Sequence, residues 1–200
     1  MFKIDISNIY PFIDNNLYNH IIQYFNHFNI IISINENFLI INDTVCDINE
    51  HNTSFIDTYY LEQFSKYFSN FYSKFNNYNL YLLLTTSTSF KIIQNNIIFV
   101  DFNNFLINYN KSNNFITLNK PITDFTFSTP EIKNISYLPY NIHYNTFPYS
   151  FASFLLHLIK NYSSDKKIYN NIQSFYPTSF YSFLHRCLHN NPQDRYLLFI

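Results

Sequence analysis

The sequence predicts an α+β domain built mainly from helices, with a few short strands. The chain has 200 residues, of which 47% are apolar, and this is enough for one domain with a real core. Segments with apolar residues at helical spacing alternate with apolar runs of strand length. Neither a repeat nor a linker interrupts this pattern, so we expect residues 1–200 to form a single domain.

The first predicted elements are a helix, two strands and a second helix. Residues 15–28 carry apolar side chains at the helical period, namely Leu17, Ile21, Ile22, Tyr24, Phe25 and Phe28. Residues 29–35 and 37–42 then indicate a pair of strands. The second helix is predicted over residues 58–75, whose apolar face consists of Tyr60, Leu61, Phe64, Tyr67, Phe68, Phe71, Tyr72 and Phe75.

The rest of the chain begins with strands and ends with helices. Three short apolar runs predict strands at residues 80–84, 90–93 and 97–100. Residues 103–143 are rich in Asn, Thr and Pro, and we expect them to be irregular and outside the core. Pro148 suits the first turn of a helix, and residues 149–159 are apolar nearly all round, which predicts a buried central helix. A last helix is expected over residues 179–190.

The chain contains no glycine, and this excludes every site that depends on a glycine-rich turn. Phosphate-binding loops bring the backbone close to the ligand at positive φ, which glycine alone adopts freely. We therefore predict neither a Walker loop nor a dinucleotide fingerprint nor a kinase glycine-rich loop. Where a turn needs the left-handed region, asparagine should take the place of glycine.

The charge pattern argues against nucleic acid and membranes as partners. The formal net charge is −1 and only 12% of residues are charged, so no basic stripe is available for nucleic acid. The apolar runs are far shorter than a membrane-spanning helix, and residues 1–6 lack the layout of a signal peptide. We expect an intracellular protein, most simply cytoplasmic, with Cys46 and Cys187 reduced in or near the core.

Four short motifs share an order and spacing found in one family. They are Val100-Asp101-Phe102, Ser128-Thr129-Pro130-Glu131, Tyr149-Ser150-Phe151-Ala152 and the segment from Cys187 to Arg195 that contains Asn191-Pro192-Gln193-Asp194-Arg195. Together with the predicted elements, they resemble the eukaryotic protein kinase family, from its third strand to just past its penultimate helix. The resemblance implies a protein-kinase-like fold, mainly the helical C-terminal lobe (residues 46–200) with a reduced N-terminal lobe (residues 1–45).

The resemblance implies roles for four of these residues. Asp101 stands where the family's Asp-Phe-Gly aspartate binds magnesium. Phe102 stands where the phenylalanine of that motif packs under the family's regulatory helix. Glu131 matches the glutamate of Ala-Pro-Glu, and Arg195 matches a buried arginine near the end of the lobe. These two side chains are expected to form a structural ion pair, buried and bidentate.

The same alignment implies that the catalytic chemistry is missing. The catalytic aspartate falls on Leu83, the preceding arginine on Leu82 and the second magnesium ligand on Thr88. A leucine cannot accept a proton, so no base would orient a substrate hydroxyl. The family's aspartate at the head of the central helix aligns with Phe147. Tyr81 is still able to stack on Phe102 and is expected to be structural.

The nucleotide-binding half is equally incomplete in the alignment. Lys3 is the sole candidate for the phosphate-binding lysine, and its usual glutamate partner is replaced by Tyr18, with Asp14 one turn earlier. A flexible N-terminal charge is the simpler interpretation of Lys3. The alignment starts after the two strands and the loop that cover ATP, so either the lobe is reduced or the reading frame is a fragment.

Two other patterns in the sequence resemble known sites. His185, Cys187 and His189 suggest metal ligands, but on a helix only the two histidines share a face, which is too few for a zinc site. Leu84-Thr85-Thr86-Ser87 resembles the catalytic-loop tail of the small kinase of the tRNA threonylcarbamoyl machinery. That family lacks the Pro-Glu and Asn-Pro-x-x-Arg elements present here.

The sequence therefore favours a catalytically inactive kinase-like domain, or pseudokinase. It would act as a scaffold or regulatory partner of another protein, such as an active kinase, with no cofactor. The alternative is a divergent Ser/Thr kinase that transfers the γ-phosphate of ATP with the help of Mg²⁺, using Lys3 and Asp101. A third possibility is an unrelated helical structural or interaction protein.

Overall fold

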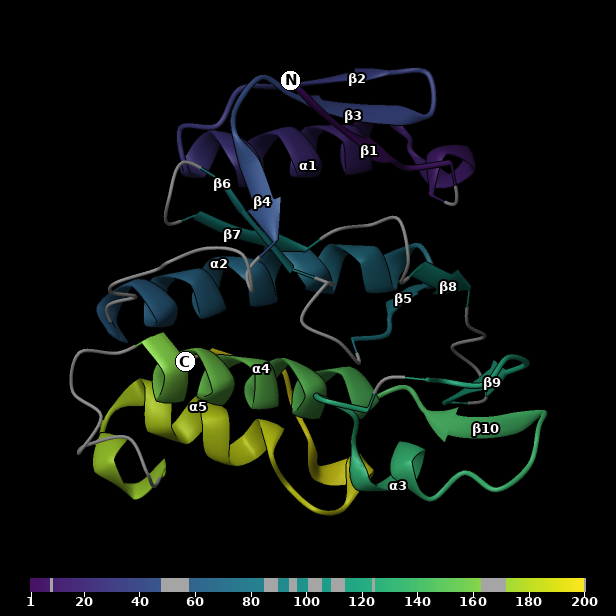
Figure 1. Ribbon diagram of the computed structural model, residues 1–200, viewed down its shortest axis with the longest axis vertical. Coiled ribbons are helices and arrows are strands. Elements are labelled where there is room, and N and C mark those ends of the chain that lie inside the picture. Colours follow the sequence, from purple (N-terminus) through teal and green to yellow (C-terminus); the bar gives the residue numbers. More distant parts are fainter. Residues whose placement is uncertain are drawn as a thin grey trace.

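The computed structural model describes residues 1–7, 9–47, 58–84, 90–93, 97–100, 106–108, 114–123, 125–162 and 172–199. Figure 1 shows a small sheet with one helix at the N-terminal end and a body of helices below it. Small antiparallel sheets and five α-helices make up the described chain, so the predicted α+β class is confirmed. No described helix combines the length and the apolar character that a bilayer crossing would need.

The N-terminal unit is a three-stranded antiparallel sheet covered by helix α1. Strands β1 (Phe2–Asp5), β2 (Ile32–Asn35) and β3 (Phe38–Ile41) form the sheet in the order β1-β3-β2. Helix α1 (Asn15–His27) buries the face made of Leu17, Ile21, Tyr24 and Phe25. The helix and both strands predicted in this region are confirmed.

Helix α2 (Thr58–Asn77) is the long helix predicted by the aromatic pattern, and it extends two residues beyond the predicted end. Its buried face packs on α1 and on the helices below it. Two serines in this face, Ser65 and Ser69, donate hydrogen bonds of 2.6 Å to the carbonyls four residues earlier. These bonds satisfy the hydroxyls without a partner from another element.

Short strands follow α2, as predicted. Strands β6 (Phe90–Ile93) and β7 (Ile97–Val100) form a second antiparallel sheet with β4 (Val45–Asp47), which precedes α2 and was not predicted. The order in the sheet is β4-β6-β7. Strand β5 (Leu80–Leu82) pairs with β8 (Leu106–Asn108). In Figure 1 the sheet of β4, β6 and β7 lies between α1 and α2, and β5 and β8 lie beside the end of α2.

The expectation for residues 103–143 was wrong in part. This stretch contains β8 together with β9 (Phe115–Leu118), helix α3 (Pro130–Lys133) and β10 (Tyr140–His143), and β9 pairs with β10. It also adds buried side chains to the core, namely Ile116, Leu118, Phe127, Ile132 and Ile142. Ile116, Leu118 and Ile142 point inward, whereas Phe115, Thr117 and Asn141 are exposed. The high average polarity of the stretch therefore hid the strands from prediction.

Helix α4 (Thr146–Tyr162) is the predicted central helix, and its burial is confirmed. It lies between α2 and α5 (Ser179–Cys187) in Figure 1. The side chains of Phe151, Phe154 and Leu155 are fully inaccessible to solvent. Helix α5 ends earlier than predicted, because the chain leaves the helix at Leu188.

Asparagine takes the place of glycine at three of the four positive-φ positions among the described residues. Asn29, Asn79 and Asn114 have φ values between 55° and 58°, and the fourth position is Glu36 at 49°. Asn29 and Asn79 follow the ends of α1 and α2, where helices commonly end on a left-handed residue. The predicted role of asparagine is confirmed at these turns.

Candidate functional site

The segment aligned with a kinase catalytic loop is apolar and buried. Tyr81 and Leu84 have no exposed surface, and Leu82 and Leu83 are 3% and 8% exposed. Leu83 occupies the position implied for the catalytic base, and its side chain belongs to the hydrophobic core. No group at this position can accept a proton or bind a metal ion. Asp101, Phe102 and Thr88 lie outside the described residues.

Tyr81 joins this buried segment to the start of α4. Thr146 and the backbone N–H of Phe147 lie close to its hydroxyl. Burial is the main cause that raises the pKa of Tyr81 far above that of free tyrosine, so the phenol stays neutral at physiological pH. Phe147, the position implied for an aspartate, stacks on Tyr72 with ring centroids 4.0 Å apart. An aromatic contact is therefore present where the family has a charged one.

Glu131 and Arg195 form the ion pair that the resemblance implied. Glu131 lies in the first turn of α3, and Arg195 follows the 3-10 turn η6 (Pro192–Asp194). The two guanidinium nitrogens donate to the two carboxylate oxygens at 2.5 and 3.2 Å, which is a bidentate arrangement. One expectation was wrong, because Arg195 is fully buried but the side chain of Glu131 is 21% exposed.

Arg195 has further partners, so that four of its five N–H donors form hydrogen bonds. Its Nε donates to the carbonyl of His189 at 2.7 Å, and one terminal nitrogen donates to the carbonyl of Asn190 at 3.0 Å. The guanidinium also lies over the ring of Tyr149 on α4, 4.9 Å from the ring centre. The side chain of Arg195 therefore contacts α3, α4 and the C-terminal segment at once.

Lys3 and Asp14 do not meet in the described structure. Lys3 is an exposed residue of β1, and its Nζ lies 5.8 Å from the ring centre of Phe38. Asp14 caps α1 by accepting from the N–H of Leu17, and it also accepts a 2.8 Å hydrogen bond from the Tyr78 hydroxyl. The side chain of Tyr18, aligned with the family's glutamate, is exposed. Nothing in this arrangement prepares Lys3 to hold a phosphate.

The histidine and cysteine residues near the C-terminus do not gather as ligands. His189 lies beyond the end of α5, so the expectation that it shares a helix face with His185 was wrong. The Sγ of Cys187 is buried, as predicted, and donates to the carbonyl of Tyr196 at 3.3 Å. Within the described ranges, no three His, Cys, Asp or Glu side chains are placed to hold a metal ion.

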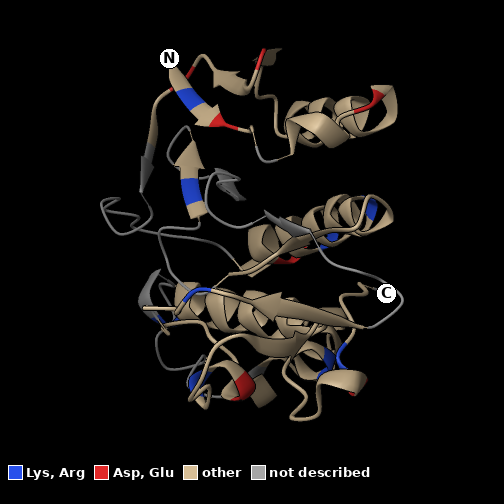
Figure 2. Ribbon diagram, turned by 90° about the vertical axis from the view of Figure 1, so that its right-hand side faces the viewer, with Lys and Arg blue, Asp and Glu red and all other residues tan. Residues whose placement is uncertain are grey.

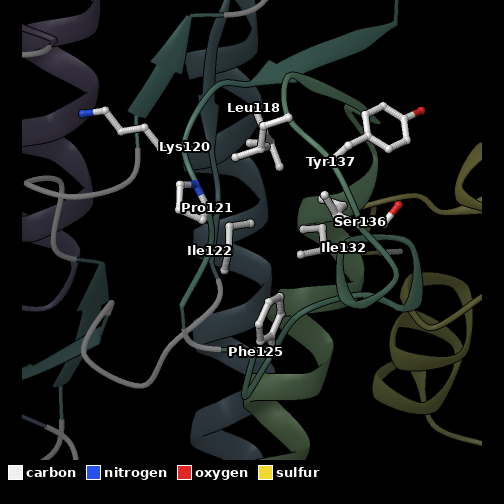
Figure 3. Close-up of a pocket in the computed structure, with 10 residues that line it drawn as sticks. Leu118, Lys120, Pro121, Ile122, Phe125, Ile132, Ser136 and Tyr137 are labelled. Atoms are coloured by element: carbon white, nitrogen blue, oxygen red, sulfur yellow. The ribbon is translucent and has the colours of Figure 1, made fainter.

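The described surface has a pocket beside α3, with a volume of about 310 Å³. Figure 3 shows Leu118, Ile122, Phe125 and Ile132 converging on it. The complete lining is Leu118, Lys120, Pro121, Ile122, Phe125, Ile132, Ile135, Ser136, Tyr137 and Leu138. Reasoning from the sequence missed this site because residues 103–143 were expected to be irregular. The short run Phe115-Ile116-Thr117-Leu118, rich in aromatic and β-branched residues, is the signal that could have revealed a strand in its wall.

The charged residues of the described ranges are spread over the molecule. Figure 2 shows the basic and acidic residues scattered singly over the upper and lower parts of the described chain. No protein-family pattern matches the sequence, and no curated protein is significantly similar to it. A function must therefore be inferred from the buried segment at Leu83, the Glu131–Arg195 pair and the pocket beside α3.

Proposed function

We propose that this chain is a catalytically inactive protein-kinase-like domain that acts by binding a protein partner. The observation that carries the proposal is the ion pair between Glu131 and Arg195. Two residues 64 positions apart, each chosen from a short motif, make a bidentate contact around a fully buried arginine. A chance match of motifs gives no reason for this contact.

The order of elements supports the same assignment. The resemblance implies a helix and two strands, then a long helix, short strands, the Glu131 segment and a buried central helix. The chain has α1, β2, β3, α2, β5 to β7, α3 and α4 in this order. On this proposal, residues 1–45 are the remnant of the N-terminal lobe and residues 46–200 are the C-terminal lobe.

The loss of catalysis is inferred from the residues that replace the chemistry. Leu83 is part of the core at the position of the base, and Lys3 lies on the surface without a carboxylate partner among the described residues. Phosphoryl transfer depends on a positioned base, a paired lysine and two metal ligands. A domain that keeps its structural pair and the Asp101 position, but lacks the base, the paired lysine and the second metal ligand, is suited to binding and not to catalysis.

Thermal unfolding with and without Mg²⁺-ATP tests the inactive state. We expect no change in Tm at millimolar Mg²⁺-ATP, for the chain as it stands and for Lys3→Met alike. A ligand present at 100 times its Kd adds about 2.7 kcal/mol of stability, so real binding would be easy to detect. A magnesium-dependent rise in Tm that Lys3→Met removes would instead favour the divergent Ser/Thr kinase.

A further inference from the structure

The pocket beside α3 has an apolar floor, with a lysine on one side and a tyrosine on the other. Leu118 and Ile132 are buried at its base, and Ile122 and Ile135 are half-buried around them. Figure 3 shows Lys120 extending away from the floor on one side and Tyr137 extending away on the other. The ring of Tyr137 is supported edge-to-face by Tyr140 of β10, with centroids 5.6 Å apart.

The rim of the pocket leaves large apolar side chains in contact with water. Phe125 is 42% exposed, Leu138 is 39% exposed and Tyr137 is 65% exposed. Protein interfaces are rich in such aromatic residues, and their strongest contacts are side chains that enter a pocket. A small molecule in a cavity of about 310 Å³ would leave this rim uncovered, whereas a polypeptide would cover both the floor and the rim.

The charge at the rim indicates which residue of a bound polypeptide would lie next to a side chain that enters the pocket. Lys120 is exposed, and none of the lining residues that the structure describes is acidic. A cation at the edge of an apolar surface selects partners that place a negative charge opposite to it. An acidic residue close to the inserted side chain would satisfy this requirement.

We propose that the pocket receives one bulky apolar side chain from a protein partner, and that an Asp or Glu nearby in the partner's sequence lies against Lys120. This inference rests on the proposed binding function and adds the chemistry of the partner segment. Leu118 and Ile132 at the base, Ile122 beside them and Phe125 at the rim supply the apolar contact, and Lys120 selects the acidic neighbour.

Fluorescence anisotropy with labelled synthetic peptides of about ten residues tests the inference. Each peptide has a Ser/Gln background, a central Phe or Ala, and a Glu or Lys two positions to either side. We expect the peptides with a central Phe to bind at least about tenfold more tightly than those with a central Ala. The peptides that carry Glu should bind about three- to fivefold more tightly than those that carry Lys.

Two matched pairs of variants locate the binding. Phe125→Ala should weaken binding of the Phe peptide severalfold, whereas Phe38→Ala, an equally exposed phenylalanine on β3, should have no effect. Lys120→Glu should reverse the preference for Glu over Lys, and Lys66→Glu on α2 should leave it unchanged. Because all four residues are exposed, these substitutions preserve the fold.

Specific outcomes would overturn the inference. Equal binding of the Phe and Ala peptides, equal effects of Phe125→Ala and Phe38→Ala, or no binding at millimolar peptide would each reject the pocket as a docking site. An unchanged Glu preference in Lys120→Glu would reject the acidic neighbour. N-acetylphenylalanine amide binding as tightly as the peptide would indicate a small-ligand site. A Tm shift with Mg²⁺-ATP alongside normal peptide binding would reject only the inactive state.

Discussion

Arg195 is the residue on which the lower half of the molecule depends most. A fully buried cation is unfavourable unless it is paired and hydrogen-bonded, and here four of the five N–H donors meet one carboxylate and two carbonyls. Removing the carboxylate leaves the guanidinium with carbonyls alone. We expect Glu131→Ala to lower the free energy of unfolding by about 3–5 kcal/mol, measured by urea denaturation. Arg195→Met should cost less, because the remaining carboxylate reaches water, and the double variant should cost less than the sum.

A neighbouring contact between a histidine and a carboxylate provides the control for this cycle. His189 and Asp194 approach to 3.5 Å, but both side chains are about half exposed. Asp194→Asn should therefore change the free energy of unfolding by less than about 1 kcal/mol. If Glu131→Ala proved as mild as Asp194→Asn, and additive with Arg195→Met, the pair would not be the structural link inferred here.

At the scale of elements, Asp14 connects the start of α1 to the end of α2. The N–H of Leu17 lowers the pKa of Asp14 most, and the Tyr78 hydroxyl lowers it further. A carboxyl with a lowered pKa in the folded chain stabilises the fold above its ordinary value of 3.8, and this contribution is lost as the pH falls through the lowered value. Tyr78→Phe should raise the pKa of Asp14 toward 3.8 and weaken the dependence of stability on acid pH, as measured by NMR titration and urea unfolding.

Asp5 is the control for that titration. Its pKa is also lowered, but by the backbone N–H and the hydroxyl of Ser7 within the same turn. Tyr78→Phe should leave the pKa of Asp5 unchanged. An Asp14 pKa that also stayed constant would mean that the hydrogen bond does not link the two helices in solution.

The elements that could be predicted are those whose pattern is local. Helices α1, α2 and α4 follow from apolar periodicity, because each buries a continuous face or its whole surface. The β9–β10 pair could not be predicted as readily, since Phe115 pairs with His143 across an intervening helix. A strand whose partner is distant in sequence leaves only a weak alternation as its signal.

The candidate site also has parts that could be predicted from the sequence and parts that could not. Glu131 and Arg195 could be predicted as partners because both lie in short motifs with a family spacing. The pocket could not, because Leu118, Ile122 and Ile132 come together only through the fold of α3 and β9. The position of Leu83 within the core also requires the three-dimensional structure, although its chemistry follows from the sequence alone.

At the scale of the whole molecule, the N-terminal unit is joined to the helical body through aromatic contacts. Tyr24 on α1 stacks on Phe71 of α2 with ring centroids 4.3 Å apart. The ring centroids of His27 and Tyr67 are 3.4 Å apart. Stacked and buried aromatic pairs each contribute about 0.5–1.5 kcal/mol beyond their burial. Residues 1–45 and the body should therefore unfold together, despite being separate lobes in the proposed kinase-like fold.

Native-state hydrogen exchange measures this coupling directly. We expect the slowest amides of α1 and α4 to exchange with the same free energy of opening, because both require global unfolding. Phe71→Ala removes the stacked contact between Tyr24 and Phe71, and α1 should then open at a lower free energy than α4. Phe115→Ala, an exposed position on β9, should leave the two values equal. If α1 already opened at a much lower free energy in the unaltered chain, the N-terminal unit would be an independently unfolding piece, and the aromatic contacts with α2 would not hold the molecule together.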